Sequence, residues 1–400
     1  MEQVTKTGKV YFLLFTLMIA ITSFEFFFRD GKLFSCWTAL VFIVFLKKKI
    51  LIPQNIQLLF IGIFVIFFFQ SLAYSHYSIL GCITRMIAWI GAFTLAHIVN
   101  VNYRKYFITI ISIIAAYSLI IYLLSYIPSI REFLLYTVCP KFPSLGVENA
   151  IQEGGGQNFI IYNYQVDYLN EAIGFYRNCG PFWEPGMFAC FLNIALFLNI
   201  NYGGNKWISL LLIITTISTF STGGFVGFLF VIFSYFQLHS KGNTFVYVLG
   251  IIFVVFLFQY LSSLSFVGLK VLNQLDNASV GTDASRFGAI LTQEKMIEAS
   301  PIIGGENIEQ YTESGTLSSA LLLPFVNFGL FIGSYIYMLL FKSCISNSYR
   351  WGRGKKEGIY LFLLILILSI SQTITLNTFV LVMMFCGLVK TKKNIWNNLI

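Results

Sequence analysis

The sequence predicts an all-α polytopic membrane protein with about twelve transmembrane helices, and three observations lead to this fold class. First, 57% of the 400 residues are hydrophobic and 11% are charged, which leaves too few polar side chains to cover a water-facing globule. Second, apolar runs of about 20 residues, the length that crosses a bilayer as a helix, recur along the chain. Third, runs such as 60–69 are apolar on every side and lack the alternation of barrel strands. The whole chain, 1–400, is therefore expected to be one integral membrane domain.

Twelve membrane spans are expected from the positions of the apolar runs. The first run follows Lys6 and Lys9, as the apolar core of a secretory signal would. No small-residue cleavage site follows its aromatic end, so it is interpreted as a membrane helix. The predicted spans are 10–28, 33–46, 56–74, 79–99, 106–127, 182–200, 207–220, 224–238, 244–262, 317–341, 358–370 and 379–389.

Two of the apolar intervals are interrupted near their middle by polar residues. One lies between Lys206 and Lys241 and is broken at 221–224, and a second, also flanked by lysines, is broken at 369–378. Because both ends of each interval are basic, each is predicted to be a hairpin. Its arms are shorter than the roughly 20 residues of a full span. The polar turn then either lies below the membrane surface, lining protein or a wet cavity, or joins two tilted spans in a thinned bilayer.

The distribution of basic residues predicts that both termini and the loop 342–357 face the cytoplasm. In this orientation the inside segments hold 17 of the 26 Lys and Arg residues and the outside segments hold 8, while Arg85 falls within a span. This partition follows the positive-inside rule. The net charge of +9 is thus explained by topology and by anionic lipid headgroups, and no nucleic-acid partner is expected.

Two outside loops, 128–181 and 263–316, are each 54 residues long, and every other connection is much shorter. Long ordered loops are usually functional, so the chemistry of the protein is expected there. Of the seven cysteines, Cys139 and Cys179 fall in the same outside loop, where a disulfide and two free thiols are both open possibilities.

The end of the first loop joins a charged pair to the start of a membrane helix. Arg177 and Glu184 lie on either side of Gly180 and Pro181, and Pro185 and Gly186 follow. A proline fits the first turn of a helix, and a carboxylate is stabilised beside the positive end of the helix dipole. An acidic helix cap would explain this pattern. A rigid backbone rich in Gly and Pro that approaches a phosphate or a sugar would explain it as well.

The second loop contains a predicted short amphipathic helix on the membrane surface. Asp283 or Ser285 would cap it and Pro301 would end it. Arg286 lies in its first turn, where a guanidinium could bind a lipid diphosphate at headgroup depth or merely extend to the surface from an anchoring helix. The apolar positions expected to form one stripe are Phe287, Ile290, Leu291 and Ile297.

Several catalytic patterns are missing from the sequence. It has no Gly-rich nucleotide loop with Lys, no His/Glu metal constellation and no nucleophile elbow. ATP-driven transport, metallohydrolysis and serine hydrolysis therefore have no support, and neither a metal site nor a cofactor is expected. Glu25 and Arg85 are the clearly intramembrane charges, and they either pair with each other or extend to the membrane surface.

Taken together, these motifs resemble those of the bacterial O-antigen and capsular polysaccharide polymerases (Wzy-type), within the O-antigen ligase/polymerase superfamily, and the resemblance spans nearly the whole topology. The order and sidedness of the motifs are more specific than any one of them. The matching pieces are Arg177 with 182–186, the run 221–224, Arg286 followed by Ser300, Pro301 and Gly304, and 313–315 before a helix that ends with 328–333.

The resemblance implies a GT-C-like fold and a metal-independent glycosyl transfer at the outer leaflet of a bacterial inner membrane. By the same resemblance, the donor is a growing glycan on undecaprenyl diphosphate, and the acceptor is the terminal sugar of another lipid-linked oligosaccharide repeat unit. Membrane lipid surrounds such an enzyme, and a chain-length regulator protein is an expected partner.

The expected leaving group explains the arginines. Breaking a sugar–diphosphate bond builds negative charge that, without a metal, Arg or Lys must compensate. Arg286, Arg177 and Glu184 are the catalytic candidates, with Glu184 as the general base ahead of Glu306 and Glu313. The candidate substrate-binding residues are Arg85, Pro185, Gly186, Ser221, Thr222, Gly223, Gly224, Gly304, Glu306 and Glu313.

One departure from the superfamily separates the alternative functions. Its ligases are expected to carry a His near the end of the second large loop, and 263–316 contains none. This favours a polymerase over an O-antigen ligase-type transferase. A lipid-linked oligosaccharide flippase or another transporter is a further alternative, but such a protein should keep its loops short.

Overall fold

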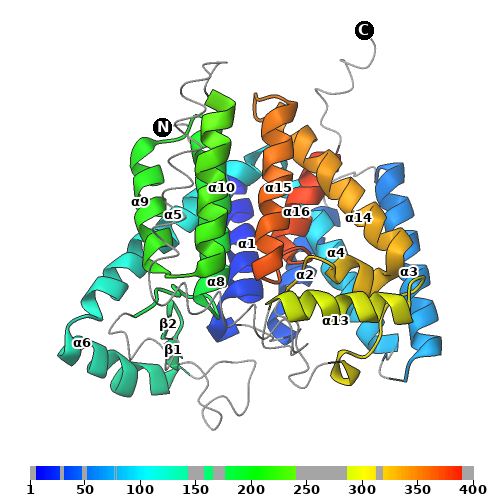
Figure 1. Cartoon of the computed structure of the whole chain (residues 1–400), viewed down its shortest axis with the longest axis horizontal. Helices are drawn as coiled ribbons and strands as arrows, with labels where there is room; N and C mark the ends of the chain where they lie inside the picture. The colour runs from blue at the N-terminus through cyan, green and yellow to red at the C-terminus, as the bar shows by residue number, and fades with distance from the viewer. Residues whose placement is uncertain are drawn as a thin grey trace.

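A computed structural model gives the fold of the chain, and its described residues are 6–27, 31–46, 52–75, 77, 79–142, 157–164, 176–239, 286–311 and 319–389. Most of these residues are helical, which confirms the all-α class (Figure 1). The described helices that fall on the predicted spans are α1 Lys6–Ser23, α2 Gly31–Leu46, α3 Gln54–Ala73, α4 Ile79–Val99, α5 Tyr103–Leu124, α8 Pro185–Asn201, α9 Lys206–Ser218, α10 Thr222–His239, α14 Leu323–Arg350, α15 Lys355–Ser371 and α16 Thr378–Leu388.

Five helices in the described part of the chain are long and apolar enough to cross a membrane: Gln54–Ala73, Gly81–Val99, Tyr103–Leu124, Thr222–His239 and Leu323–Arg350. Their length and composition mark a membrane-associated protein. The other helices are shorter, and the predicted span 244–262 lies outside the described residues. Twelve spans and a GT-C-like architecture therefore stay predictions.

The two short helices α8 and α16 form the core of the bundle. Nearly every residue of α8 and every residue of α16 is buried, as expected of helices that are hydrophobic all round. Phe379 at the start of α16 lies 4.2 Å from Phe191 of α8 and 5.7 Å from Phe107 of α5, measured between ring centroids. Because protein encloses them, these helices do not have to match the thickness of a bilayer.

The helix α14 departs from its predicted boundaries, 317–341, and from the predicted loop 342–357. It starts at Leu323, continues to Arg350 and is broken at Gly329, whose φ of 70° lies in the left-handed region. The break arises because a segment of the second loop inserts there: the Gly305 N–H donates to the Val326 carbonyl at 2.7 Å, and the Leu330 N–H donates to the Pro301 carbonyl at 2.8 Å. The helix extends further than predicted because Arg350, in its last turn, donates to the carbonyls of Cys386 and Val389.

The described parts of both long loops gather at one end of the bundle, called here the α13 end (Figure 1). The second loop contributes α13, Arg286–Ala299, which runs transverse to the bundle and packs on α14 and α15, and η5, Ile308–Gln310. The elements of the first loop are α6 Pro128–Glu132, the π-helix η3 Phe133–Val138, η4 Cys139–Lys141 and the antiparallel hairpin of β1 Gln157–Phe159 with β2 Tyr162–Tyr164, in which Phe159 pairs with Tyr162.

Cys139 and Cys179 are both buried free thiols in the structure, so the possible disulfide between them is not formed. The two predicted hairpins are present. The α9–α10 hairpin turns at 219–221 and the α15–α16 hairpin turns at 372–377, and α10 packs against α15. Both turns lie at the α13 end (Figure 1).

Candidate functional site

The guanidinium of Arg286 is the centre of the candidate site. Arg286 is the first residue of α13, and its Nη1 atom lies 2.7 Å from the position that a Cβ atom on Gly223 would occupy. The Oγ atom of Ser371, at the end of α15, contacts the same position. Arg286, Gly223 and Ser371 therefore meet at one point, although they come from three segments far apart in the sequence. No side chain fits at position 223 without moving the other two.

The start of α8 joins this point through a second glycine. A Cβ atom on Gly186 would contact the Gln372 carboxamide, with 3.0 Å to its Cδ atom, and would lie 3.5 Å from the Ser221 Oγ atom. Gly186, Ser221 and Gln372 are all buried. The turns of both hairpins and the mouth of α8 are thus packed together, and Arg286 lies beside them.

Two more charged residues complete the site. The pKa of the Arg286 guanidinium is lowered from its ordinary value of 12.5 mainly by burial; the carboxylate of Glu184 opposes this shift, and the positive charge of Arg177 adds to it. Both neighbours are therefore within electrostatic reach of Arg286. Arg286, Arg177 and Glu184 are each partly exposed, whereas Gly186, Ser221 and Gln372 beneath them are buried. The arrangement places two basic side chains and one acidic side chain next to this buried layer.

Arg177 is held on the turn between α9 and α10. Its Nε atom donates to the Thr219 carbonyl at 3.3 Å. The next residue, Asn178, donates from its backbone N–H to the Ser218 carbonyl at 2.9 Å and from Nδ2 to the Ser218 Oγ atom at 3.0 Å. Its Oδ1 atom accepts from the Gly180 N–H at 3.0 Å, which closes the turn towards Glu184. This network fixes the first-loop arginine to the hairpin that carries Gly223.

Two helix N-termini open onto the site, those of α8 and α10. At α10, the Ser221 Oγ atom accepts from the Gly224 N–H at 3.2 Å and so acts as a side-chain cap. At α8, Glu184 occupies the N-cap position, but its side chain makes no capping hydrogen bond. Glu184 therefore lies beside the positive end of the helix dipole, as the acidic-cap explanation expects, but without a hydrogen bond to the helix. The positive ends of the two helix dipoles, together with Arg286 and Arg177, favour an anion here.

The helix α13 is anchored by a buried glutamine. The Gln293 Nε2 atom donates to the Ser319 carbonyl at 2.6 Å, and its Oε1 atom accepts from the Leu322 N–H at 3.1 Å. Ala289 and Met296 are buried on the same side of the helix. The predicted apolar stripe of α13 is thus wrong, because Leu291 is 45% exposed and the buried side carries a polar residue. The periodicity argument assumed a lipid partner, whereas α13 packs on α14 and α15. Arg286 consequently turns inwards, and is not a surface anchor.

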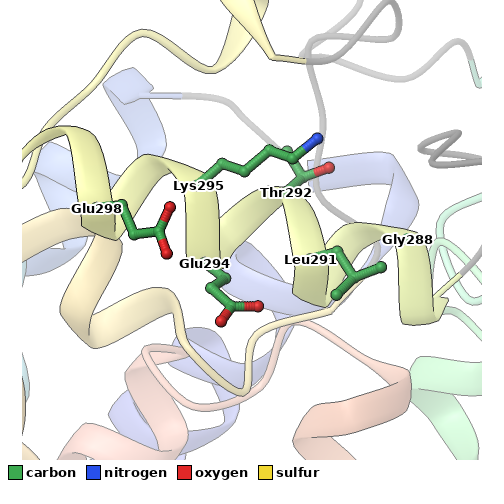
Figure 2. Close-up of a pocket in the computed structure, with 6 residues that line it drawn as sticks. All are labelled: Gly288, Leu291, Thr292, Glu294, Lys295 and Glu298. Atoms are coloured by element: carbon green, nitrogen blue, oxygen red, sulfur yellow. The ribbon is translucent and has the colours of Figure 1, made fainter.

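A depression of 330 Å³ follows the outer flank of α13 (Figure 2). Two exposed carboxylates, Glu294 and Glu298, lie one turn apart along it. Its remaining described lining residues are Gly288, Leu291, Thr292 and Lys295. The lining residue nearest to Arg286 along the helix is Gly288, two residues further on.

The structure separates other predicted site residues from Arg286. Glu306 lies beyond the far end of α13, whose 14 residues span about 20 Å, and its carboxylate accepts from the Tyr74 hydroxyl at 3.0 Å. Gly304, with a φ of 61°, packs against the backbone of the broken α14. The Arg85 guanidinium lies over the ring of Tyr77, 4.6 Å from its centroid. These contacts do not bring the three residues to Arg286, and their predicted part in substrate binding stays a prediction.

Glu313 lies outside the described residues, as do the proposed caps Asp283 and Ser285. Pro185 and Gly224 are buried structural members of the α8 and α10 starts, and Thr222 is partly exposed at the start of α10. Sequence reasoning missed Ser371 and Gln372. The polar break at 369–378 was the signal that could have identified them, but it was used only to place a hairpin turn.

In the described part of the chain, no group of three or more His, Cys, Asp and Glu side chains could hold a metal ion. The charged groups of the candidate site are accordingly two guanidinium groups and one carboxylate. Comparison of the chain with protein-family models, with curated proteins and with solved structures finds no match.

Proposed function

We propose that this chain is a glycosyltransferase that polymerises lipid-linked oligosaccharide repeat units into a polysaccharide such as O-antigen or capsule. The observation that carries the proposal is the meeting of Arg286 with Gly223 and Ser371, beside Arg177 and Glu184. The resemblance to Wzy-type polymerases rests on several of these positions, and the fold brings them together from both long loops. A GT-C-like fold and a metal-independent reaction are part of the same proposal.

The arginines fit the chemistry of a diphosphate leaving group. In the proposed reaction, the oxygen of an acceptor hydroxyl forms a bond to the anomeric carbon of the donor, and the bond between that carbon and the diphosphate oxygen breaks. The electron pair of the broken bond stays on the diphosphate. Arg286 and Arg177 would stabilise the developing charge, and the N-termini of α8 and α10 would add to their effect.

Glu184 is the proposed general base, which would accept the proton of the acceptor hydroxyl. Two observations support this role: its carboxylate makes no capping hydrogen bond, and it is partly exposed beside Arg286. Glu306, a second candidate from the sequence, is disfavoured because α13 separates it from Arg286 by about 20 Å.

The depression along α13 is the proposed path of the sugars. Carboxylate oxygens such as those of Glu294 and Glu298 accept hydrogen bonds from sugar hydroxyls, and the exposed Leu291 offers an apolar contact for a ring face. The two carboxylates lie roughly 12 and 18 Å along the helix from Arg286, so the path would accommodate more than one sugar beyond the reacting bond.

The proposal places the α13 end at the outer leaflet of a bacterial inner membrane, as the partition of basic residues predicts. The substrates there would be undecaprenyl-diphosphate-linked oligosaccharides, and a chain-length regulator is a proposed protein partner. Reporter fusions at residues 155 and 277 test this orientation. A cytoplasmic readout at either position would reject it.

The direct test is polymerisation by the purified protein of a synthetic repeat unit on undecaprenyl diphosphate. Wild-type protein should form a ladder of lengthened lipid-linked chains, and Glu184→Gln should slow it by on the order of 10² to 10⁴ with unchanged abundance. Transfer to a non-repeat acceptor without lengthening would indicate a ligase. Movement of the lipid across vesicles without any new glycosidic bond would indicate a flippase.

A further inference from the structure

The first loop begins with a short helical arm, residues 126–138, that no part of the proposed reaction uses. The helix α5 ends at Leu124, Pro128 then starts α6, and η3 continues it without a gap. In Figure 1 this arm runs along the edge of the α13 end, transverse to α10 and α15. A helix that leaves a membrane span and turns parallel to the bundle end is placed at the level of the membrane surface.

Large apolar and aromatic side chains are exposed along the arm. Tyr126 is 43% exposed, Ile127 46%, Phe133 56% and Tyr136 70%. Leu135 and Cys139, on the other side, are buried against the protein. Burial of these side chains would be favourable by roughly 25 cal/mol per Å² of apolar surface removed from water. The exposed side of the arm is therefore expected to contact another apolar phase or molecule.

The apolar side chains exposed at the end of α5 indicate what the arm contacts. The exposed surface of that candidate span is apolar up to its end, where Ile120 and Leu123 are 60% and 59% exposed. Leu124, Tyr126 and Ile127 carry exposed apolar side chains from the end of α5 to the start of the arm. The arm is therefore expected to contact the same lipid that surrounds the candidate span α5. Tyrosine is enriched where a membrane meets water, because its ring is apolar and its hydroxyl is polar.

We propose that the arm 126–138 lies in the lipid headgroup region at the α13 end, with Phe133 and Tyr136 at the boundary of the acyl chains. The partner is the lipid surface itself, bound by an in-plane helix. This assignment does not depend on the proposed reaction. It would place the beginning of the predicted outside loop 128–181 at the membrane surface.

The arm is also fastened to the segment that carries Arg177. The Arg131 guanidinium lies 4.2 Å from the ring centroid of Tyr176, the residue before Arg177. The Tyr126 ring packs edge-on against Tyr176 at 5.7 Å, and the Tyr122 hydroxyl donates to the Tyr176 carbonyl at 3.0 Å. Through these contacts the depth of the arm in the membrane fixes the depth of Arg177. An arm at headgroup level holds this arginine near lipid phosphates.

Site-directed spin labelling of the full chain in nanodiscs of phosphatidylethanolamine and phosphatidylglycerol tests the proposal. Cys36, the exposed cysteine, is first replaced by Ser, and single cysteines are then introduced as Phe133→Cys and Tyr136→Cys, with Lys356→Cys, at the exposed start of α15, as the control in water. All three sites are exposed, so the label should not disturb packing. Labels at 133 and 136 should collide with oxygen several-fold more often than with a water-soluble nickel chelate, and the label at 356 should show the reverse preference.

Equal access of the nickel chelate to all three labels would overturn the proposal, because the arm would then lie in water. Strong dipolar broadening at 133 or 136 that disappears on dilution with unlabelled protein would also overturn it, since a second copy of the chain would then cover the arm. Circular dichroism of each variant, matched to the wild type, confirms that the labelled proteins are folded.

Discussion

Arg286 lies over Gly223, with its Nη1 atom 2.7 Å from the place where a side chain at position 223 would begin. This contact joins the second long loop to the turn of the α9–α10 hairpin. It also explains why position 223 requires a glycine. The requirement comes from space and not from backbone conformation, because a Cβ atom there would collide with Arg286 and Ser371. The guanidinium of Arg286 can therefore occupy this position only because Gly223, on another helix, has no side chain.

Gly223→Ala should displace Arg286 and Ser371 while leaving the bundle assembled. A shift of about 1 Å in a charged catalytic group costs up to roughly 10² in rate, so polymerisation by the purified variant should fall by about that factor. Gly354→Ala is the matched control, because its Cβ atom would meet its nearest neighbour, the Glu357 carboxylate, at 3.4 Å. If both variants polymerised at the wild-type rate, Arg286 would not be held by position 223.

Gln293→Leu should loosen α13 from the bundle. The substitution removes both hydrogen bonds of the carboxamide and leaves the Ser319 carbonyl and the Leu322 N–H without this partner in a buried place. Each such loss costs about 1 to 3 kcal/mol. Amide hydrogen exchange in α13 should therefore accelerate by one or more orders of magnitude.

The control for this change is Glu294→Gln, at the exposed neighbouring position. It should leave the exchange of α13 unaltered. Exchange in Gln293→Leu that matched the wild type would show that apolar packing of Ala289 and Met296 alone secures the helix.

Cys139 should be unreactive in the folded protein. Burial raises the pKa of its thiol from 9.0 to about 11, so at pH 8 only about one thiol in 10³ would be ionised. Maleimide at pH 8 should label Cys139 and Cys179 only after unfolding. Unchanged mobility on gels with and without reductant should show that no disulfide forms. Rapid labelling of Cys139 under native conditions would contradict its buried position.

The same shift predicts a weak loss of stability in alkali. Between pH 9 and about 11 the thiol of Cys139 ionises in the unfolded chain and stays protonated in the folded one. The unfolded state then binds fewer protons, so the free energy of unfolding falls as the pH rises through this window. Replacing Cys139 by Ala should reduce this alkaline slope.

Sequence patterns predicted the features that depend on local composition. The apolar runs predicted the helices, and the polar breaks at 221–224 and 369–378 predicted two hairpins, because these signals lie within the segments themselves. The helix from Arg286 was predicted for the same reason: Pro301 would end it and a cap would begin it. Its buried face was not, because the Gln293 side chain bonds to backbone groups that lie 26 and 29 residues further along the chain.

The composition of the candidate site could be predicted only in part. Arg286 stands out by its charge, Glu184 by its charge before a proline, and Gly223 as a glycine in a polar break. The fold brings these three residues together. Ser371 and Gln372 resemble many other polar residues at a helix end, and their contribution depends on how α15 packs beside α10. The charge of Glu306 could not show that the length of α13 separates it from Arg286 by about 20 Å.

The last prediction separates a diphosphate-binding role of Arg286 from a structural one. Arg286→Ala should abolish chain lengthening by the purified protein, and Arg286→Lys should restore only a small part of it, because an ammonium keeps the charge but loses the two-pronged contact with phosphate oxygens. Lys141→Ala, an exposed cation at the same end of the bundle, is the control and should polymerise normally. If Arg286 only neutralised Glu184, Lys would substitute almost fully, and the double variant Arg286→Ala with Glu184→Gln would recover what the single change lost. Binding of the undecaprenyl-diphosphate repeat unit, measured without turnover, decides between the two. Loss of affinity in Arg286→Ala that the second change does not recover supports the diphosphate role, whereas unchanged affinity leaves Arg177 as the cation that holds the donor.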